Sequence, residues 1–111
     1  MNFSSSFSYI FLFFFKAEFN TRVFIDYIVF VNRIDYPQYM ARSDKIDLNT
    51  ILVVNGQTTM TWFANTGDMG ARRIFSCMRQ ADGFYAEQLS GVNAGHNAVN
   101  FMEIWIYGAA L

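Results

Sequence analysis

The chain begins with a regular alternation of apolar and polar positions. Aromatic rings occupy most odd positions from Phe3 to Phe15, whereas positions 4, 6 and 8 are serine. A period of two is that of a β-strand with one buried face. From Ile10 the even positions also become apolar, so both faces of the strand need cover. We therefore expect residues 1–15 to form an aromatic strand or arm that contacts a neighbouring subunit, because such a strand would aggregate if left exposed.

A second apolar segment follows at residues 22–34. It is rich in β-branched and aromatic side chains and shows no polar face at helical spacing, which predicts a central strand. Asp26 interrupts the segment, so we expect it to be paired or to lie at a bend. Residues 32–45 contain the only proline, Pro37, together with several polar residues, which is typical of a long connection.

Two dipeptides predict tight hairpin turns. Asn55-Gly56 and Asp82-Gly83 both suit the positive φ angles of a type I′ turn. The predicted arms are residues 47–54 and 57–63 for the first hairpin, and residues 72–80 and 84–89 for the second. Residues 84–90 could instead form a helical turn. A last strand covers residues 99–107 and ends at Gly108.

These segments amount to about seven short strands and no convincing helix. A chain of 111 residues has room for one hydrophobic core. We therefore expect a single all-β domain spanning residues 1–111, folded as an antiparallel β-sandwich or jelly roll.

The composition suggests that the domain is part of an assembly. Aromatic residues make up 19% of the chain and charged residues only 15%, against about 25% charged in an ordinary soluble domain. A small domain cannot easily bury so many rings by itself, so the expected partners are copies of itself or other assembly subunits. A net charge of -1 argues against nucleic acid.

Targeting and membrane signals are weak. The apolar run at residues 9–15 lacks a preceding basic region and a following small-residue cleavage site, which argues against a signal peptide. It is also shorter than the roughly 20 residues of a membrane-spanning helix. We expect no membrane span.

The chain offers little for catalysis or metal binding. Cys77 is the only cysteine and His96 the only histidine, and nothing in the sequence brings them together. The alternative, a buried thiol and a solvated imidazole, is the more common arrangement. One residue of each kind does not make a zinc site. The glycines and arginines of residues 66–73 lack the spacing of a phosphate loop. We expect no enzyme, no metal and no cofactor.

Carbohydrate binding is the more plausible site chemistry. Sugars are held by an exposed aromatic ring with amides and carboxylates around it. The candidate ligand-binding residues are Trp62, Asn65, Asp68, Tyr85, His96 and Asn97. The alternative is that Trp62 belongs to the core, as a tryptophan in an alternating strand usually does. If Trp62, Tyr85 and Trp105 are all buried, the glycan hypothesis loses its platform.

The C-terminal half also resembles small β-sandwich domains at the tips of phage tail fibres. The resemblance rests on Gly83-Phe84-Tyr85-Ala86, on the loop Asn93-Ala94-Gly95-His96-Asn97, and on the aromatic strand from Phe101 to Gly108. It implies a multimeric virion protein, assembled in the host cytoplasm, with no catalytic residue. The sequence therefore favours a non-enzymatic structural subunit of a virion capsid or tail. The alternative is a carbohydrate- or receptor-binding β-sandwich module.

Overall fold

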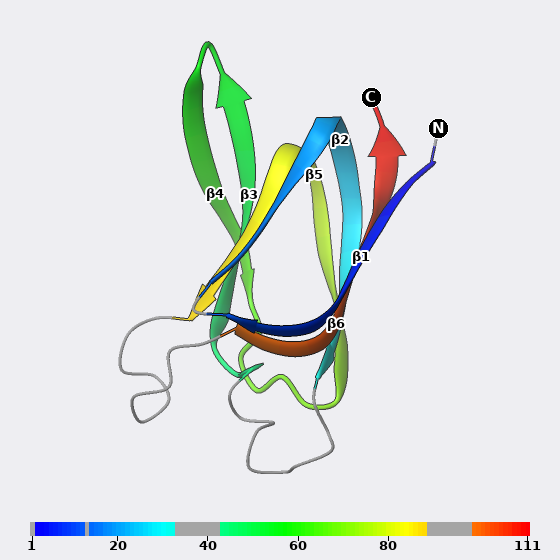
Figure 1. Cartoon of the computed structure of the whole chain (residues 1–111), viewed down its shortest axis with the longest axis vertical. Coiled ribbons are helices and arrows are strands. Elements are labelled where there is room, and N and C mark those ends of the chain that lie inside the picture. The colour runs from blue at the N-terminus through cyan, green and yellow to red at the C-terminus, as the bar shows by residue number, and fades with distance from the viewer. Residues whose placement is uncertain (1, 13, 33–42, 89–98) are drawn as a thin grey trace.

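The protein is an all-β domain, seen here in a computed structural model that describes residues 2–12, 14–32, 43–88 and 99–111 (Figure 1). The strands are β1 (Asn2–Leu12), β2 (Phe14–Asn32), β3 (Ile46–Val54), β4 (Gln57–Asn65), β5 (Arg72–Gln88) and β6 (Val99–Ala110). They form one antiparallel sheet in the order β1-β6-β2-β5-β3-β4. The described ranges contain no α-helix, and the predicted antiparallel all-β class is confirmed.

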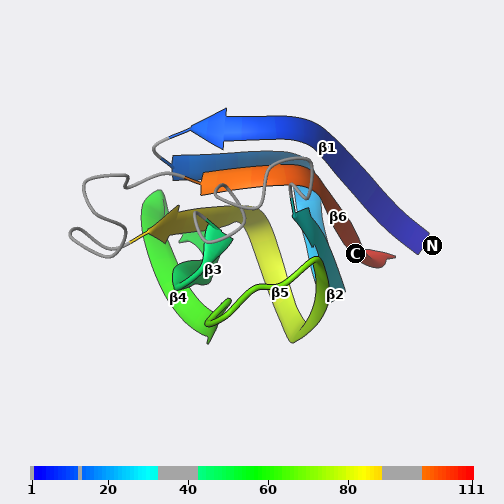
Figure 2. The same ribbon diagram turned by 90° about the horizontal axis from the view of Figure 1, so that it is seen from below.

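The sheet folds over on itself because its two longest strands bend. Residues 14–18 of β2 pair with residues 83–87 of β5, and residues 23–31 of β2 pair with residues 72–81 of β5. A register shift separates these two stretches between Glu18 and Val23. Figures 1 and 2 show β2 and β5 turning together, so that each strand belongs to both halves of the sheet. The result is a β-sandwich-like fold.

Aromatic rings fill the space between the two halves. Phe84 lies 6.2 Å from Phe30 and 6.1 Å from Phe15, measured between ring centroids. All three side chains are buried, and each contributes roughly 1.5–3 kcal/mol of hydrophobic stabilisation. Part of the aromatic content that suggested a partner is therefore buried within the described residues, whereas Phe14, Trp62 and Trp105 remain exposed.

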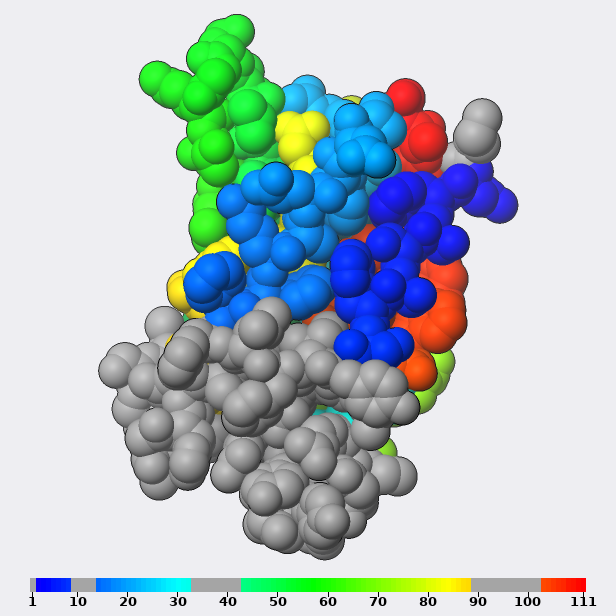
Figure 3. Space-filling view, viewed as in Figure 1, coloured from blue at the N-terminus to red at the C-terminus, as the bar shows by residue number. Residues whose placement is uncertain are grey.

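Strand β1 covers one side of this core. Phe3 makes an edge contact with Phe19 at 5.1 Å, and Phe7 makes one with Phe15 at 5.0 Å. The space-filling view shows β1 and the start of β2 together on one face (Figure 3). The alternation predicted for the first residues is confirmed, because Phe3 and Phe7 are half-buried while the side chains at positions 4, 6 and 8 are exposed. Contact with a neighbouring subunit stays a prediction.

One of the two predicted hairpin turns is confirmed. Asn55 and Gly56 have φ angles of 53° and 76°, as a type I′ turn requires, and they join β3 to β4. The prediction for Asp82-Gly83 is wrong, because β5 runs through both residues without reversing. Glycine is required at position 83 for a different reason, because a Cβ there would lie 2.6 Å from the carbonyl oxygen of Ala17. The glycine allows close approach of β2 rather than a turn.

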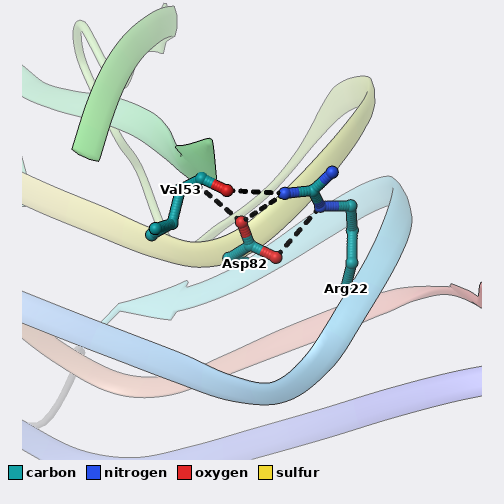
Figure 4. Close-up of polar contacts among 3 residues, drawn as sticks. All are labelled: Arg22, Val53 and Asp82. Carbon is teal, nitrogen blue, oxygen red and sulfur yellow. Dashed lines mark hydrogen bonds and ion pairs between the residues drawn. The ribbon is translucent and has the colours of Figure 1, made fainter. Parts of the chain in front are cut away.

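Asp82 instead ties the bends of the sheet together (Figure 4). Its carboxylate accepts hydrogen bonds from Arg22 Nε at 3.1 Å and Arg22 Nη2 at 3.0 Å. It also accepts one from the backbone N–H of Val53 at 2.7 Å, while Arg22 donates to the Val53 carbonyl at 2.8 Å. These contacts join β2, β5 and the end of β3.

The structure also tests the predictions for Asp26, for residues 84–88 and for the end of the last strand. Asp26 lies at a bend, because the register of β2 shifts between Ile25 and Tyr27 against both neighbouring strands. Residues 84–88 are extended and not helical. Strand β6 continues through Gly108 to Ala110, so its predicted end was too early. Pro37 lies outside the described residues.

Candidate functional site

An aromatic and polar surface covers the outer side of β4, β3, β5 and the first half of β2. The inward residues Leu48, Phe84 and Ala86 are buried, so their sequence neighbours point outward. The pairing aligns these outward residues in two rows across the sheet. One row contains Trp62, Asn49, Tyr85 and Lys16, and the other contains Asn65, Asp47, Glu87 and Phe14. We call these eight residues the aromatic–polar face.

Trp62 is the most exposed ring on this face, with 55% of its surface accessible. Its indole Nε1 donates a hydrogen bond to Asp47 Oδ1 at 2.8 Å. The side-chain amide of Asn65 donates to the same oxygen at 2.9 Å. The carboxylate of Asp47 therefore fixes the edge of the indole while the ring remains accessible to solvent.

Tyr85 is held in a similar way on the neighbouring strand. Its hydroxyl donates to Glu87 Oε2 at 3.0 Å, and its ring stacks on Phe14 with centroids 5.6 Å apart. Burial and the nearby carboxylate of Glu87 raise the pKa of the Tyr85 phenol. The phenol therefore stays neutral at physiological pH. Phe14 is 50% exposed, so the stacked pair also faces solvent.

The two rows bring ring surfaces and hydrogen-bonding groups to a spacing that suits a sugar. Strand β3 lies between Trp62 and Tyr85, so two strand spacings, or ~10 Å, separate their backbones. Asp47 and Asn49 lie between them, and the half-buried Asp47 is more accessible than Asn49, which is only 9% exposed. A saccharide offers C–H groups that pack on aromatic faces and hydroxyls that bond to amides and carboxylates. The face presents both kinds of group within the length of one or two sugar rings.

The structure brings together half of the residues singled out from the sequence. Trp62, Asn65 and Tyr85 share the aromatic–polar face. Asp68 is exposed in the connection between β4 and β5, outside the two rows. His96 and Asn97 lie outside the described residues. The candidate list from the sequence omitted the other five members of the face, namely Phe14, Lys16, Asp47, Asn49 and Glu87.

A weak sequence signal for two of these members does exist. Asp47 and Asn49 are polar at alternate positions of a strand in which only Thr50 is otherwise polar, and this alternation marks an outward face. Only the strand pairing shows that this outward face meets Trp62 and Tyr85.

The remaining candidate chemistry finds no support in the described part of the chain. Burial raises the pKa of the Cys77 thiol to about 11, so the thiol is protonated and a poor nucleophile. Among the residues described, three or more His, Cys, Asp or Glu side chains nowhere gather as a metal site would require. Within those same ranges there is also no helix of the length and apolarity needed to cross a bilayer.

Comparison with known proteins supplies a fold relative. No family model and no curated protein matches the sequence. Among solved structures, the chain is similar to a mutant of the lectin binding domain of lectinolysin, complexed with Lewis b. The TM-score is 0.63 at 13% sequence identity, and the match covers 96% of this chain and 72% of that one. The two proteins share a fold. The bent sheet described above is β-sandwich-like, as the tail-fibre resemblance implies, whereas the tail-fibre relationship itself stays a prediction.

Proposed function

We propose that this protein is a carbohydrate-recognition module without catalytic activity. The observation that carries the proposal is the exposure of Trp62 on a sheet face where Asn49 and Tyr85 lie in register with it and Asp47 binds its indole N–H. Burial of the rings would have removed the platform. Instead Trp62 is 55% exposed, Trp105 is 36% exposed and Tyr85 is half-buried.

The charges on the face favour a neutral glycan. Asp47 and Glu87 place two carboxylates next to the rings, and they would repel the acidic groups of a sialylated or sulfated sugar. Lys16 is the one cation of the two rows, and its ammonium lies 2.9 Å from Glu18. Neutral hydroxyls, by contrast, can donate hydrogen bonds to the free lone pairs of both carboxylates.

The fold relative supports the same function. The solved structure to which this chain is similar is a lectin binding domain holding Lewis b, which is a glycan. Fold alone does not transfer a ligand, so the argument for this chain rests on its own side chains. An assembly role as a virion capsid or tail subunit, as the sequence suggested, is compatible with glycan binding, because a receptor-binding subunit would do both.

A glycan array tests the proposal. The wild-type chain, Trp62→Ala and the control Met60→Ala would be applied to neutral, sialylated and sulfated glycans. Met60 is 48% exposed on the same strand, so its removal controls for loss of apolar surface. We expect the wild type and Met60→Ala to bind neutral glycans, and Trp62→Ala to give a signal at least about tenfold weaker. An array without any bound glycan, or with equal signals from all three chains, would refute the proposal.

A further inference from the structure

A second aromatic surface lies on the outer side of the other half of the sheet. Tyr27 of β2 and Tyr107 of β6 are paired across the sheet, and their rings stack 4.9 Å apart at 25°. Trp105 lies two residues before Tyr107, with its ring 6.3 Å away and inclined by only 7°. Tyr27 is 39% exposed and Trp105 36%. Three nearly parallel rings are therefore accessible on one face.

Trp105 is held by the same kind of hydrogen bond as Trp62. Trp105 Nε1 donates a hydrogen bond to Glu103 Oε2 at 2.8 Å, as Trp62 Nε1 does to Asp47 Oδ1 at the same distance. Both tryptophans of the chain thus have the indole N–H bound to a carboxylate on their own face and the ring left accessible. A ring held this way loses little conformational freedom when a ligand packs on it.

A hollow beside the rings supplies polar groups. It has a volume of about 380 Å³, and Tyr27 and Tyr107 line it together with Asn2, Ser4 and Asp26. Small-ligand sites begin at about 300 Å³. The β-bulge at residues 25–27 places Asp26 in this lining, and bulges commonly re-aim a side chain beside a binding site. An amide, a hydroxyl and a carboxylate therefore surround two aromatic rings.

A second hollow lined by the same two tyrosines has different neighbours. It measures about 350 Å³ and is lined by Val29, Arg72 and Ile74 as well as by the rings. Val29 and Ile74 offer aliphatic contacts for the less polar face or a substituent of a sugar, and Arg72 adds hydrogen-bond donors beside them, whereas the first hollow suits the hydroxyls. The two hollows share Tyr27 and Tyr107, so one extended ligand can contact both.

We propose that Tyr27, Tyr107 and Trp105, with the hollow at Asp26, form an independent second carbohydrate-binding site, which makes the domain bivalent. The ligand class rests on the proposed function, but the site does not use any residue of the aromatic–polar face. The aromatic core around Phe30 and Phe84 separates the two surfaces. Each site can therefore engage a different glycan chain, and two weak contacts add up to a stronger one at a glycan-covered surface.

The two tryptophans allow each site to be observed separately. Because the chain has only Trp62 and Trp105, a ¹⁵N-labelled sample gives two indole N–H signals, assigned with Trp62→Phe and Trp105→Phe. The full chain would be titrated with L-fucose, D-galactose, D-mannose and N-acetyl-D-glucosamine up to about 100 mM, the range needed for weak monosaccharide binding. We expect at least one sugar to shift the Trp105 signal saturably, both in the wild type and in Trp62→Ala.

Variants in the hollow test which residues form the site. Asp26→Ala and Tyr27→Ala should weaken the Trp105 response at least about fivefold and leave the Trp62 response unchanged. Ser8→Ala, an exposed change on β1 outside the hollow, is the control. If the Trp62 signal moves and the Trp105 signal does not, the second site is refuted and the proposed function stands. If neither signal moves, both are refuted. A Trp105 response insensitive to both hollow variants also overturns the site as assigned here.

Discussion

Arg22 and Asp82 join the two bends on which the fold depends. Arg22 lies where β2 bends and Asp82 lies where β5 bends, and two hydrogen bonds of 3.1 and 3.0 Å connect them (Figure 4). The Arg22 hydrogen bonds, followed by the Val53 amide, lower the pKa of the Asp82 carboxyl. The stability that this pair contributes at the bends of β2 and β5 therefore depends on pH.

Asp82→Asn should make the stability of the protein less dependent on acid. The carboxyl of an unfolded chain titrates near 3.8, and folding lowers that pKa. The stabilisation is therefore complete above about pH 4 and is lost as the pH falls through the lower pKa of the folded state. We expect Asp82→Asn to be less stable than the wild type at pH 7, with a difference that shrinks below about pH 4.

Urea unfolding at pH 7, 5, 4 and 3 measures this difference. Asp68→Asn, at an exposed aspartate in the connection before β5, is the control and should follow the wild type at every pH. A wild-type advantage over Asp82→Asn that stays constant from pH 7 to pH 3 would contradict the assignment.

Gly108→Ala should strongly destabilise the fold. A Cβ at this position would overlap the carbonyl oxygen of Phe24, so the backbones of β2 and β6 would have to separate. Overpacking of this kind costs about 3 kcal/mol. Ser6→Ala on the exposed side of β1 should change the free energy of unfolding by less than about 0.5 kcal/mol. Thermal unfolding of both variants, followed by circular dichroism, measures the difference. Similar midpoints would show that β2 and β6 accommodate the added methyl group without loss of stability.

Cys77 should react slowly with thiol reagents until the protein unfolds. Burial raises its pKa to about 11 from 9.0, so the reactive thiolate is about 100-fold scarcer at pH 8 in the folded chain. Reaction with Ellman's reagent at pH 8, with and without 8 M urea, measures the ratio of rates. Equal rates would mean that the thiol is accessible and ionised in the native state. Because folding disfavours the thiolate, stability should also fall as the pH rises from about 9 to 11.

Asp47 should act as a positioning residue for Trp62. Removing its carboxylate in Asp47→Ala frees the indole N–H, and a hydrogen bond is worth about 1 kcal/mol, or roughly fivefold in affinity. Asp47→Asn keeps an acceptor oxygen and should restore most of the binding. Glu103→Ala, which frees Trp105 on the other face, is the matched control.

The readout for Asp47 is the Trp62 indole signal in the spectra described above. A shift of this signal in Asp47→Ala without any change in glycan affinity would show that the tether is structural only. Unfolding measurements on the same samples separate loss of positioning from loss of fold.

The candidate site could be predicted in part from the sequence. Trp62 and Tyr85 stood out because each is an aromatic residue in a strand with polar residues nearby, and both do lie on one face. Asp47 and Asn49 did not stand out, because nothing near them in the sequence shows that β3 lies between the two rings. Tyr27 and Tyr107 are 80 positions apart in the numbering, and only the pairing of β2 with β6 makes them neighbours.

The sequence by itself determined the features that depend on adjacent residues. A period of two is enough to specify strands, and Asn55-Gly56 forms its turn because these two residue types tolerate positive φ angles wherever they occur. The tertiary structure decided what depends on distant segments. Asp82-Gly83 has the same local preference, but Arg22 binds the aspartate and Ala17 approaches the glycine, so the strand continues and bends. Local preferences for a turn amount to about 1 kcal/mol, and the contacts of a whole bent sheet outweigh them.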